Sequence, residues 1–227
     1  IPMKSDYLGI LSSIKKDIND SNKSQDDSIS LIVVTKSQSI DDIRKVIDIG
    51  YKSFGENYVD EGIEKINSFN DESLEWHFIG KIQSNKIKKI CKNFDWVQTI
   101  SSLKHARALN KACLETSKKI NICIQINIDR EISKSGIMIE DLDDFIKNIS
   151  TFDRLVIRGL MAIPSKINAL KENINSYKIL KTEYDRLRDK YKYFDTLSIG
   201  MSNDYKIAID NGSNMIRIGS LIFGERK

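Results

Sequence analysis

The amino-acid sequence predicts an α/β fold, a single (β/α)8 barrel with an extra N-terminal helix, from three observations. Eight short apolar or alternating segments alternate with segments of helical spacing. The 227 residues include 2 Pro and 11 Gly, and no Pro- or Gly-rich linker divides them. Strands that alternate with helices pair in parallel, and eight such units in a chain of about 250 residues are typical of a closed barrel. A doubly wound open sheet is the alternative, but neither GxGxxG after a strand nor GxxxxGK[ST] occurs.

The first 28 residues are expected to form a helix and a loop that precede the barrel. Four apolar residues at helical spacing predict an amphipathic helix over about 5–19. The polar segment 21–28 predicts a loop. We therefore expect residues 29–227 to form the barrel, within one domain that spans 1–227.

The segment 31–36, LIVVTK, predicts the first strand of the barrel. Its β-branched residues favour a strand, and an apolar run between polar turns indicates a strand covered on both faces. Ser39 as N-cap and Gly50 at the end predict the helix that follows. Lys36 therefore lies where a buried parallel strand gives way to a loop, which is where α/β folds place their chemistry.

The other elements follow from the same patterns. Short apolar or alternating runs bounded by turn residues predict the remaining strands, at 52–54, 75–79, 95–100, 120–128, 155–161, 196–198 and 215–218. Apolar residues at helical spacing predict helices at 59–69, 84–92, 103–113, 141–149 and 170–191, and a last helix capped by Ser202.

Composition and charge describe an ordinary globular protein. Hydrophobic residues make up 40% of the chain and charged residues 30%. The net charge of +4 and the pI of about 8.8 are too mild to indicate nucleic acid or membrane binding. The densest basic run, 81–92, also carries apolar residues at helical spacing, so it is interpreted as the solvated face of a helix.

Cysteine usage and hydropathy predict a cytoplasmic protein. Cys91, Cys113 and Cys123 are an odd number without Cys-x-x-Cys spacing, which favours buried thiols in a reducing compartment over disulfides or zinc. No signal peptide is recognisable, and no apolar run approaches about 18 residues, the length that a membrane span needs.

Lys36 and Arg217 are the central candidates for chemistry. Barrel closure puts the first strand beside the last, so both cations should project into the same mouth. In MIRIG, alternation turns Ile216 and Ile218 to one face and Arg217 to the other. A lysine desolvated beside another cation is a better amine nucleophile, which predicts a Schiff base with an aldehyde on a phosphorylated ligand.

Small donor-rich residues follow the last two strands, where barrels commonly hold a phosphate. Gly200 and Gly219 would let backbone N–H groups approach an anion, and Ser198 and Ser220 would add hydroxyl donors. Other strand ends offer three further candidates, namely Asn57, His77 and Met161. His77 alternates with two aromatic residues and points inward either as a hydrogen-bonded core residue or as a site residue.

Seven segments carry a family resemblance: VVTKSQ, FGENYVDEGIEKI, LEWHFIGKIQSNK, QINIDREISKSGI, RGLMAIP, LSIGMSNDYKIAI and GSNMIRIGSLIFGER. Together, over about 29–226, they resemble the pyridoxal phosphate homeostasis proteins, relatives of the alanine racemase barrel. The resemblance implies a barrel that carries pyridoxal 5′-phosphate as a Schiff base on Lys36. It implies that Ser198, Gly200, Gly219 and Ser220 hold the phosphate.

The same resemblance places Arg217 opposite the pyridine nitrogen, with Asn57, His77 and Met161 bordering the ring. The departures from the family pattern are mild and are expected to spare these anchors; they are Thr35, Ser37 and Asn203. A guanidinium only donates hydrogen bonds, so the pyridine nitrogen would stay unprotonated and the ring would be a weaker electron sink.

This chemistry predicts a protein that stores, delivers or buffers pyridoxal phosphate with little or no turnover and no catalytic residue of its own. Racemases take a second base from an added domain of a partner subunit, and this chain is expected to lack that domain because it stops at Lys227. A monomer is therefore expected. The predicted partners are pyridoxal phosphate and possible pyridoxal phosphate-dependent apo-enzymes.

Two enzyme functions compete with this prediction. The first is a pyridoxal phosphate-dependent amino-acid racemase or lyase that uses Tyr58 or His77 as the second base. The second is a Schiff-base aldolase acting on sugar phosphates, which needs an acidic general base near Lys36. Nucleic-acid binding through 81–92 is the weakest alternative.

Overall fold

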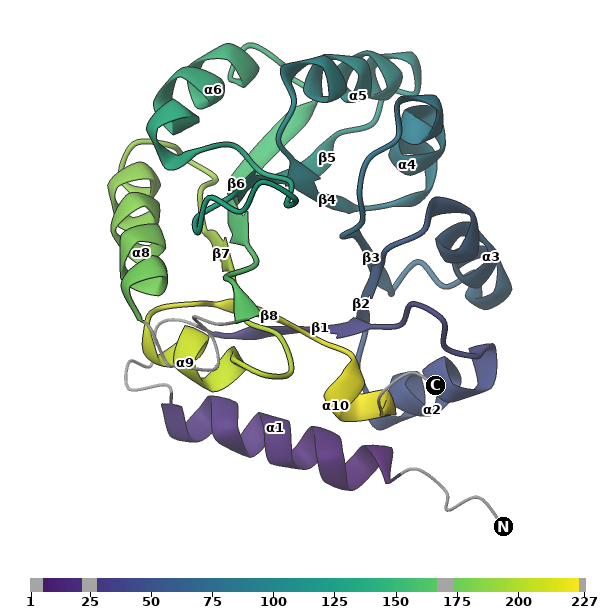
Figure 1. Ribbon diagram of the computed structural model, residues 1–227. Helices are drawn as coiled ribbons and strands as arrows, with labels where there is room; N and C mark the ends of the chain where they lie inside the picture. The colour runs from purple at the N-terminus through teal and green to yellow at the C-terminus, as the bar shows by residue number, and fades with distance from the viewer. Residues whose placement is uncertain (1–5, 22–27, 167–173, 225–227) are drawn as a thin grey trace.

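Eight parallel strands close into a barrel in the computed structural model, which describes residues 6–21, 28–166 and 174–224 (Figure 1). Consecutive strands are neighbours, and β8 closes on β1 with Ile32 opposite Arg217. The strands are β1 (Ser30–Val34), β2 (Ser53–Glu56), β3 (Glu75–Phe78), β4 (Trp96–Ile100), β5 (Ile120–Ile126), β6 (Leu155–Ala162), β7 (Thr196–Ser198) and β8 (Met215–Ile218). The predicted (β/α)8 fold is confirmed.

Helices surround this barrel and alternate with its strands (Figure 1). They are α1 (Tyr7–Ser21), α2 (Ile40–Ile49), α3 (Val59–Phe69), η1 (Ser84–Lys86), α4 (Ile87–Asn93), α5 (Leu103–Glu115), η2 (Ile139–Asp141), α6 (Leu142–Ile149), α8 (Asn175–Arg188), α9 (Tyr205–Asp210) and α10 (Ser220–Phe223). The predicted caps of α2 are confirmed. The Ser39 hydroxyl accepts a hydrogen bond from the Asp42 N–H, and Gly50 is left-handed with φ 114°.

Some predicted element ends were wrong. Ser202 does not cap a helix, because α9 begins three residues later and the Ser202 hydroxyl accepts a hydrogen bond from the Leu221 N–H. Helix α8 ends at Arg188, so Tyr191 lies outside it, and Leu170 lies outside the described residues. The short helix α10 was not predicted; four residues are too few to show a periodic pattern.

Alternation along the strands divides the buried side chains between two cores. Residues such as Trp76, Phe78, Ile216 and Ile218 face outward and pack with the helices in a large apolar core. A small apolar cluster lies inside the barrel and consists of Ile32, Trp96, Cys123, Met161 and Met215. The inward positions also carry polar residues, and those near the carboxyl ends of the strands form the candidate site.

Helix α1 lies beside α9 and α10 on the outside of the barrel (Figure 1). Its Tyr7 ring contacts the Phe223 ring at 5.5 Å between centroids, and its Asp17 accepts a hydrogen bond from the Tyr205 hydroxyl. The helix therefore covers the seam where the chain closes the barrel. Among the described helices, none has both the length and the apolar character that crossing a membrane would require.

Candidate functional site

A cavity of about 260 Å³ opens at the carboxyl ends of the strands. Six of the nine predicted site residues line it: Lys36, Asn57, Met161, Arg217, Gly219 and Ser220. The loop after β7 also contributes Met201, Ser202 and Asn203, which are not among these nine. Asn203, one of the departures from the family pattern, therefore lies at this cavity and not away from it.

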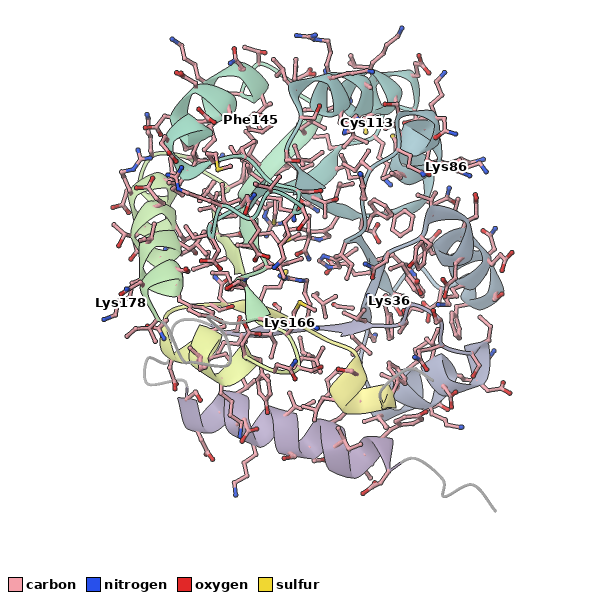
Figure 2. The ribbon with its side chains drawn as sticks, in the orientation of Figure 1. Lys36, Lys86, Cys113, Phe145, Lys166 and Lys178 are labelled. Atoms are coloured by element: carbon pink, nitrogen blue, oxygen red, sulfur yellow. The ribbon has the colours of Figure 1, made fainter. Side chains whose placement is uncertain are left out.

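Lys36 lies just beyond the end of β1, at the mouth of the barrel (Figure 2). Its side chain is half-buried and makes no hydrogen bond or ion pair with another described residue. Arg217 reaches the same cavity from β8, so the predicted meeting of the two cations is confirmed. No acidic residue occurs among the described residues that line this cavity, so its charge is positive.

A buried ionic cluster holds the backbone on both sides of Lys36 in place. It consists of Lys65, Glu56, Glu61 and Thr35. The Lys65 ammonium lies 2.6 Å from Glu56 Oε1 and 2.7 Å from Glu61 Oε1. It also donates to the Thr35 carbonyl at 2.6 Å, while the Thr35 hydroxyl donates to Glu56 Oε1 at 2.7 Å. The cluster thereby fixes the residue before Lys36.

The same cluster also holds the residue after Lys36. The Ser37 N–H donates to Glu61 Oε1, and Ser37 has a left-handed backbone with φ 63°, which costs energy for a residue with a side chain. Burial raises the pKa of Glu56, although Lys65 opposes the shift. The sequence analysis missed this cluster; the i, i+4 pair of Glu61 and Lys65 in a predicted helix was the available signal.

Arg217 is a buried cation, with 3% of its surface exposed. Its guanidinium donates to the Ser198 carbonyl at 2.9 Å, to the Ser198 hydroxyl at 2.6 Å and to the Ala162 carbonyl at 3.1 Å. Burial lowers the pKa of Arg217 to about 10, so it is still charged at neutral pH. Within the described parts of the chain it forms no salt bridge, and an anionic ligand in the cavity would supply the missing negative charge.

A chain of hydrogen bonds descends from Arg217 through the barrel interior. The Ser198 hydroxyl donates to Gln98 Oε1 at 2.6 Å, and Gln98 Nε2 lies 2.9 Å from His77 Nδ1. His77 Nε2 lies 2.8 Å from Glu75 Oε1. If the Gln98 amide donates to Nδ1, the proton of His77 is on Nε2 and faces the carboxylate. Gln98 was not predicted as a site residue.

The remaining three predicted residues lie behind the cavity lining. Ser198 is buried under Arg217, and His77 is buried lower in the barrel, where its ring stacks on Trp96 at 4.9 Å. Gly200 has φ 107°, and its carbonyl accepts the Arg217 N–H at 2.9 Å, so it shapes the loop after β7. Tyr58, one of the two residues considered as a second base, is 57% exposed and does not line the cavity.

Asn57 carries the clearest sign that the cavity is built for a ligand. Its Oδ1 is buried and has no hydrogen-bond partner within the described structure. A buried carbonyl oxygen without a donor is costly, so a ligand or water that donates to it would stabilise the site.

Stability should depend on pH through His77. Burial lowers its pKa below 6.5, with the hydrogen bond to Glu75 in opposition. Between that lowered value and 6.5 the unfolded state binds more protons, so the free energy of unfolding should fall as the pH drops through this window, by at most about 1.4 kcal/mol per pH unit. Urea unfolding at about pH 7 and about pH 5 tests this, because His77→Gln should reduce the slope. An unchanged slope in that variant would contradict the assignment.

The alanine racemase N-terminal domain model matches residues 13–227, so fold and match together define a barrel of that class. The pyridoxal phosphate homeostasis protein of Escherichia coli K12 is 41% identical over 203 residues, which are 88% of this chain and 87% of that protein. That of Buchnera aphidicola subsp. Baizongia pistaciae is 45% identical over 195 residues, 86% of each chain. The chain belongs to the pyridoxal phosphate homeostasis protein family.

Solved structures agree with this assignment. PipY of Synechococcus elongatus is 30% identical to this chain, and the match covers 96% of this chain and 100% of PipY. The TM-score is 0.86 for the PipY structure without pyridoxal phosphate and 0.83 for the structure with pyridoxal phosphate bound. An alanine racemase of Clostridium difficile, 17% identical, matches 96% of this chain and 56% of its own with a TM-score of 0.69. That likeness concerns the fold.

Proposed function

We propose that the cavity holds pyridoxal 5′-phosphate, with Lys36 as the covalent anchor, and that the protein stores, delivers or buffers this cofactor. The observation that carries the proposal is the pairing of Lys36, which has no partner among the described residues, with the buried Arg217 in one cavity. The relatives' names and the PipY structure with pyridoxal phosphate support the same ligand. A lining without carboxylates suits an anionic cofactor, and the unsatisfied Asn57 Oδ1 would accept a hydrogen bond from a donor group on it.

Each lining residue has a proposed task. The Lys36 amine attacks the aldehyde carbon; a carbon–nitrogen double bond forms and water leaves. Gly219 and Ser220 are the proposed donors to the phosphate, and Asn57 and Met161 border the ring. The residues behind the lining act indirectly: Ser198 orients Arg217, Gly200 shapes the loop, and His77 holds Gln98.

The proposed role of Arg217 favours retention of the cofactor over turnover. Bound pyridoxal phosphate supplies an electron sink whose strength depends on protonation of the pyridine nitrogen. Arg217, charged at neutral pH, can only donate to that nitrogen and so leaves it unprotonated. We therefore propose a cytoplasmic, monomeric carrier that hands the cofactor to apo-enzymes, with little or no amino-acid racemisation.

The visible absorption spectrum before and after borohydride reduction tests the proposal. Protein incubated with pyridoxal phosphate should turn yellow, lose the band on reduction, and carry the phosphopyridoxyl mass on the Lys36 peptide. A colourless, unlabelled protein would refute the proposal. Racemase or lyase assays over a panel of amino acids then test the carrier role, and robust turnover that depends on Lys36 would establish an enzyme instead.

Arg217→Met should weaken binding of pyridoxal phosphate by roughly 10- to 100-fold, because a charge-assisted hydrogen bond contributes about 1.5–3 kcal/mol. Arg217→Lys should recover only part of this loss, since an ammonium cannot reproduce the forked donation to Ser198 and Ala162. Equilibrium titration followed by absorbance gives both affinities. Equal affinity of all three proteins would exclude contact between Arg217 and the cofactor.

A further inference from the structure

A second cavity, of about 410 Å³, opens at the same end of the barrel beside β3, β4 and β5. It shares Asn57, Ile79 and Ile163 with the Lys36 cavity, so the two are neighbours across these side chains. None of the described residues that line the second cavity is acidic, whereas lysine, serine and amide side chains are abundant there. This chemistry favours a negatively charged ligand.

Gln125 is a polar side chain that the fold leaves unpaired in this cavity. It points inward from β5, opposite Met161 in register, and only 7% of its surface is exposed. Its amide makes no hydrogen bond with any residue in the described ranges. Because the Gln125 side chain lines the cavity and its amide is unengaged, a ligand there can accept a hydrogen bond from it.

The start of α5 faces the same cavity through Ser101 and Ser102. Ser102 caps this helix of 13 residues by accepting the His105 N–H. The first N–H groups of a helix have no intrahelical acceptor, and the helix dipole makes this end positive. Lys81 lines the cavity as well and forms no ion pair with another described residue.

Other polar groups around this cavity are already engaged. Lys134 is paired with Glu131 at 2.8 Å, and the Asn127 amide donates to the Glu131 carbonyl at 2.9 Å within the same loop. His105 Nε2 lies 3.3 Å from the Ser84 hydroxyl. Asn57, which this cavity shares with the Lys36 cavity, and the hydroxyls of Ser101, Ser133 and Ser135 also face it. Among the described residues, the unengaged groups that can donate from a buried side chain, an ammonium or a helix end are Gln125, Lys81 and the first turn of α5.

We propose that this second cavity is a binding subsite for an oxyanion, the phosphate or carboxylate group of a small metabolite, separate from the Lys36 cavity. The oxyanion accepts hydrogen bonds from the first turn of α5, from the Gln125 amide and from the Lys81 ammonium. The two cavities then hold two ligands side by side at the barrel mouth. This subsite does not depend on the function proposed for Lys36.

Titration of the ligand-free protein with orthophosphate, and separately with acetate, tests the subsite by two-dimensional amide NMR. Binding should shift the signals of Leu103 and Lys104 at the start of α5. Signals of Gly219 and Ser220 report the Lys36 cavity independently, so failure at one site is distinguished from failure at the other. The anion that binds more tightly identifies the group that the subsite prefers. If neither anion shifts the signals at the start of α5, the proposal is overturned.

Three variants sharpen the test. Gln125→Glu keeps the size of the side chain but places a carboxylate against the oxyanion, and it should weaken binding at α5 at least about tenfold. Lys81→Gln should weaken it about fivefold or more. Lys92→Gln, an equal change of charge on the exposed face of α4 away from both cavities, should leave it unchanged. Equal loss in Lys81→Gln and Lys92→Gln, or none in Gln125→Glu, would show an adventitious ion only.

Discussion

Replacing Lys36 with alanine is expected to abolish covalent capture of pyridoxal phosphate. Lys36 is the one lysine among the described residues that line its cavity, so no neighbouring amine can substitute for it there. Because its side chain has no partner in the described structure, the free energy of unfolding should change by less than about 0.5 kcal/mol. Absorbance, peptide mass after borohydride reduction and urea unfolding measure these effects.

Lys81→Ala is the matched control for this variant, because Lys81 lies at the same mouth but lines the neighbouring cavity. It should keep the absorption band and the label on Lys36. A Lys36→Ala protein that still becomes yellow, with the phosphopyridoxyl mass on a different lysine, would contradict the assignment of Lys36 as the anchor.

Lys65→Met is expected to destabilise the fold by about 3–5 kcal/mol, because it leaves the fully buried Glu56 carboxylate without its cation. The Thr35 hydroxyl would be the remaining donor to that carboxylate. The hydrogen bond from Lys65 to the Thr35 carbonyl, which holds the backbone next to Lys36, would also be lost. Labelling of Lys36 should therefore become slower. Urea unfolding and the rate of borohydride-trapped labelling measure the two effects.

Glu56→Gln in the Lys65→Met background should restore part of this stability, because the neutral amide removes the uncompensated charge and still accepts from Thr35. Lys45→Met is a control at an exposed ion pair with Asp42 and should cost less than about 1 kcal/mol. Equal losses of unfolding free energy in Lys65→Met and Lys45→Met would show that the buried cluster contributes no more to stability than an exposed ion pair.

The sequence predicted the barrel because each local pattern agreed with the global fold. The caps of α2, the alternation around Arg217 and the apolar run of β1 are all local signals. Predictions failed where contacts distant in sequence decide the outcome. Ser202, a good N-cap by type, instead accepts a hydrogen bond from Leu221, 19 residues away.

The candidate site was predictable to a similar extent. Closure of a parallel barrel brings the ends of its first and last strands together, so Lys36 and Arg217 could be placed in one mouth from their positions alone. The depth at which each residue lies below the cavity could not be predicted from its position in the sequence. Ser198 and His77 lie on the expected inner face of the barrel. However, Arg217 covers Ser198, and His77 is buried in the barrel interior.

By itself, the sequence determined the fold class, the family and the two cations at the barrel mouth, because periodicity, caps and motifs are properties of neighbouring residues. The tertiary structure decided how those cations are held. The Lys65 cluster spans 30 residues from Thr35, and the hydrogen bond between Gln98 and Ser198 spans 100. Such pairs form because buried polar groups need hydrogen-bond partners, and the closed barrel determines which groups lie close enough to pair. Patterns among neighbouring residues in the sequence do not indicate these pairings.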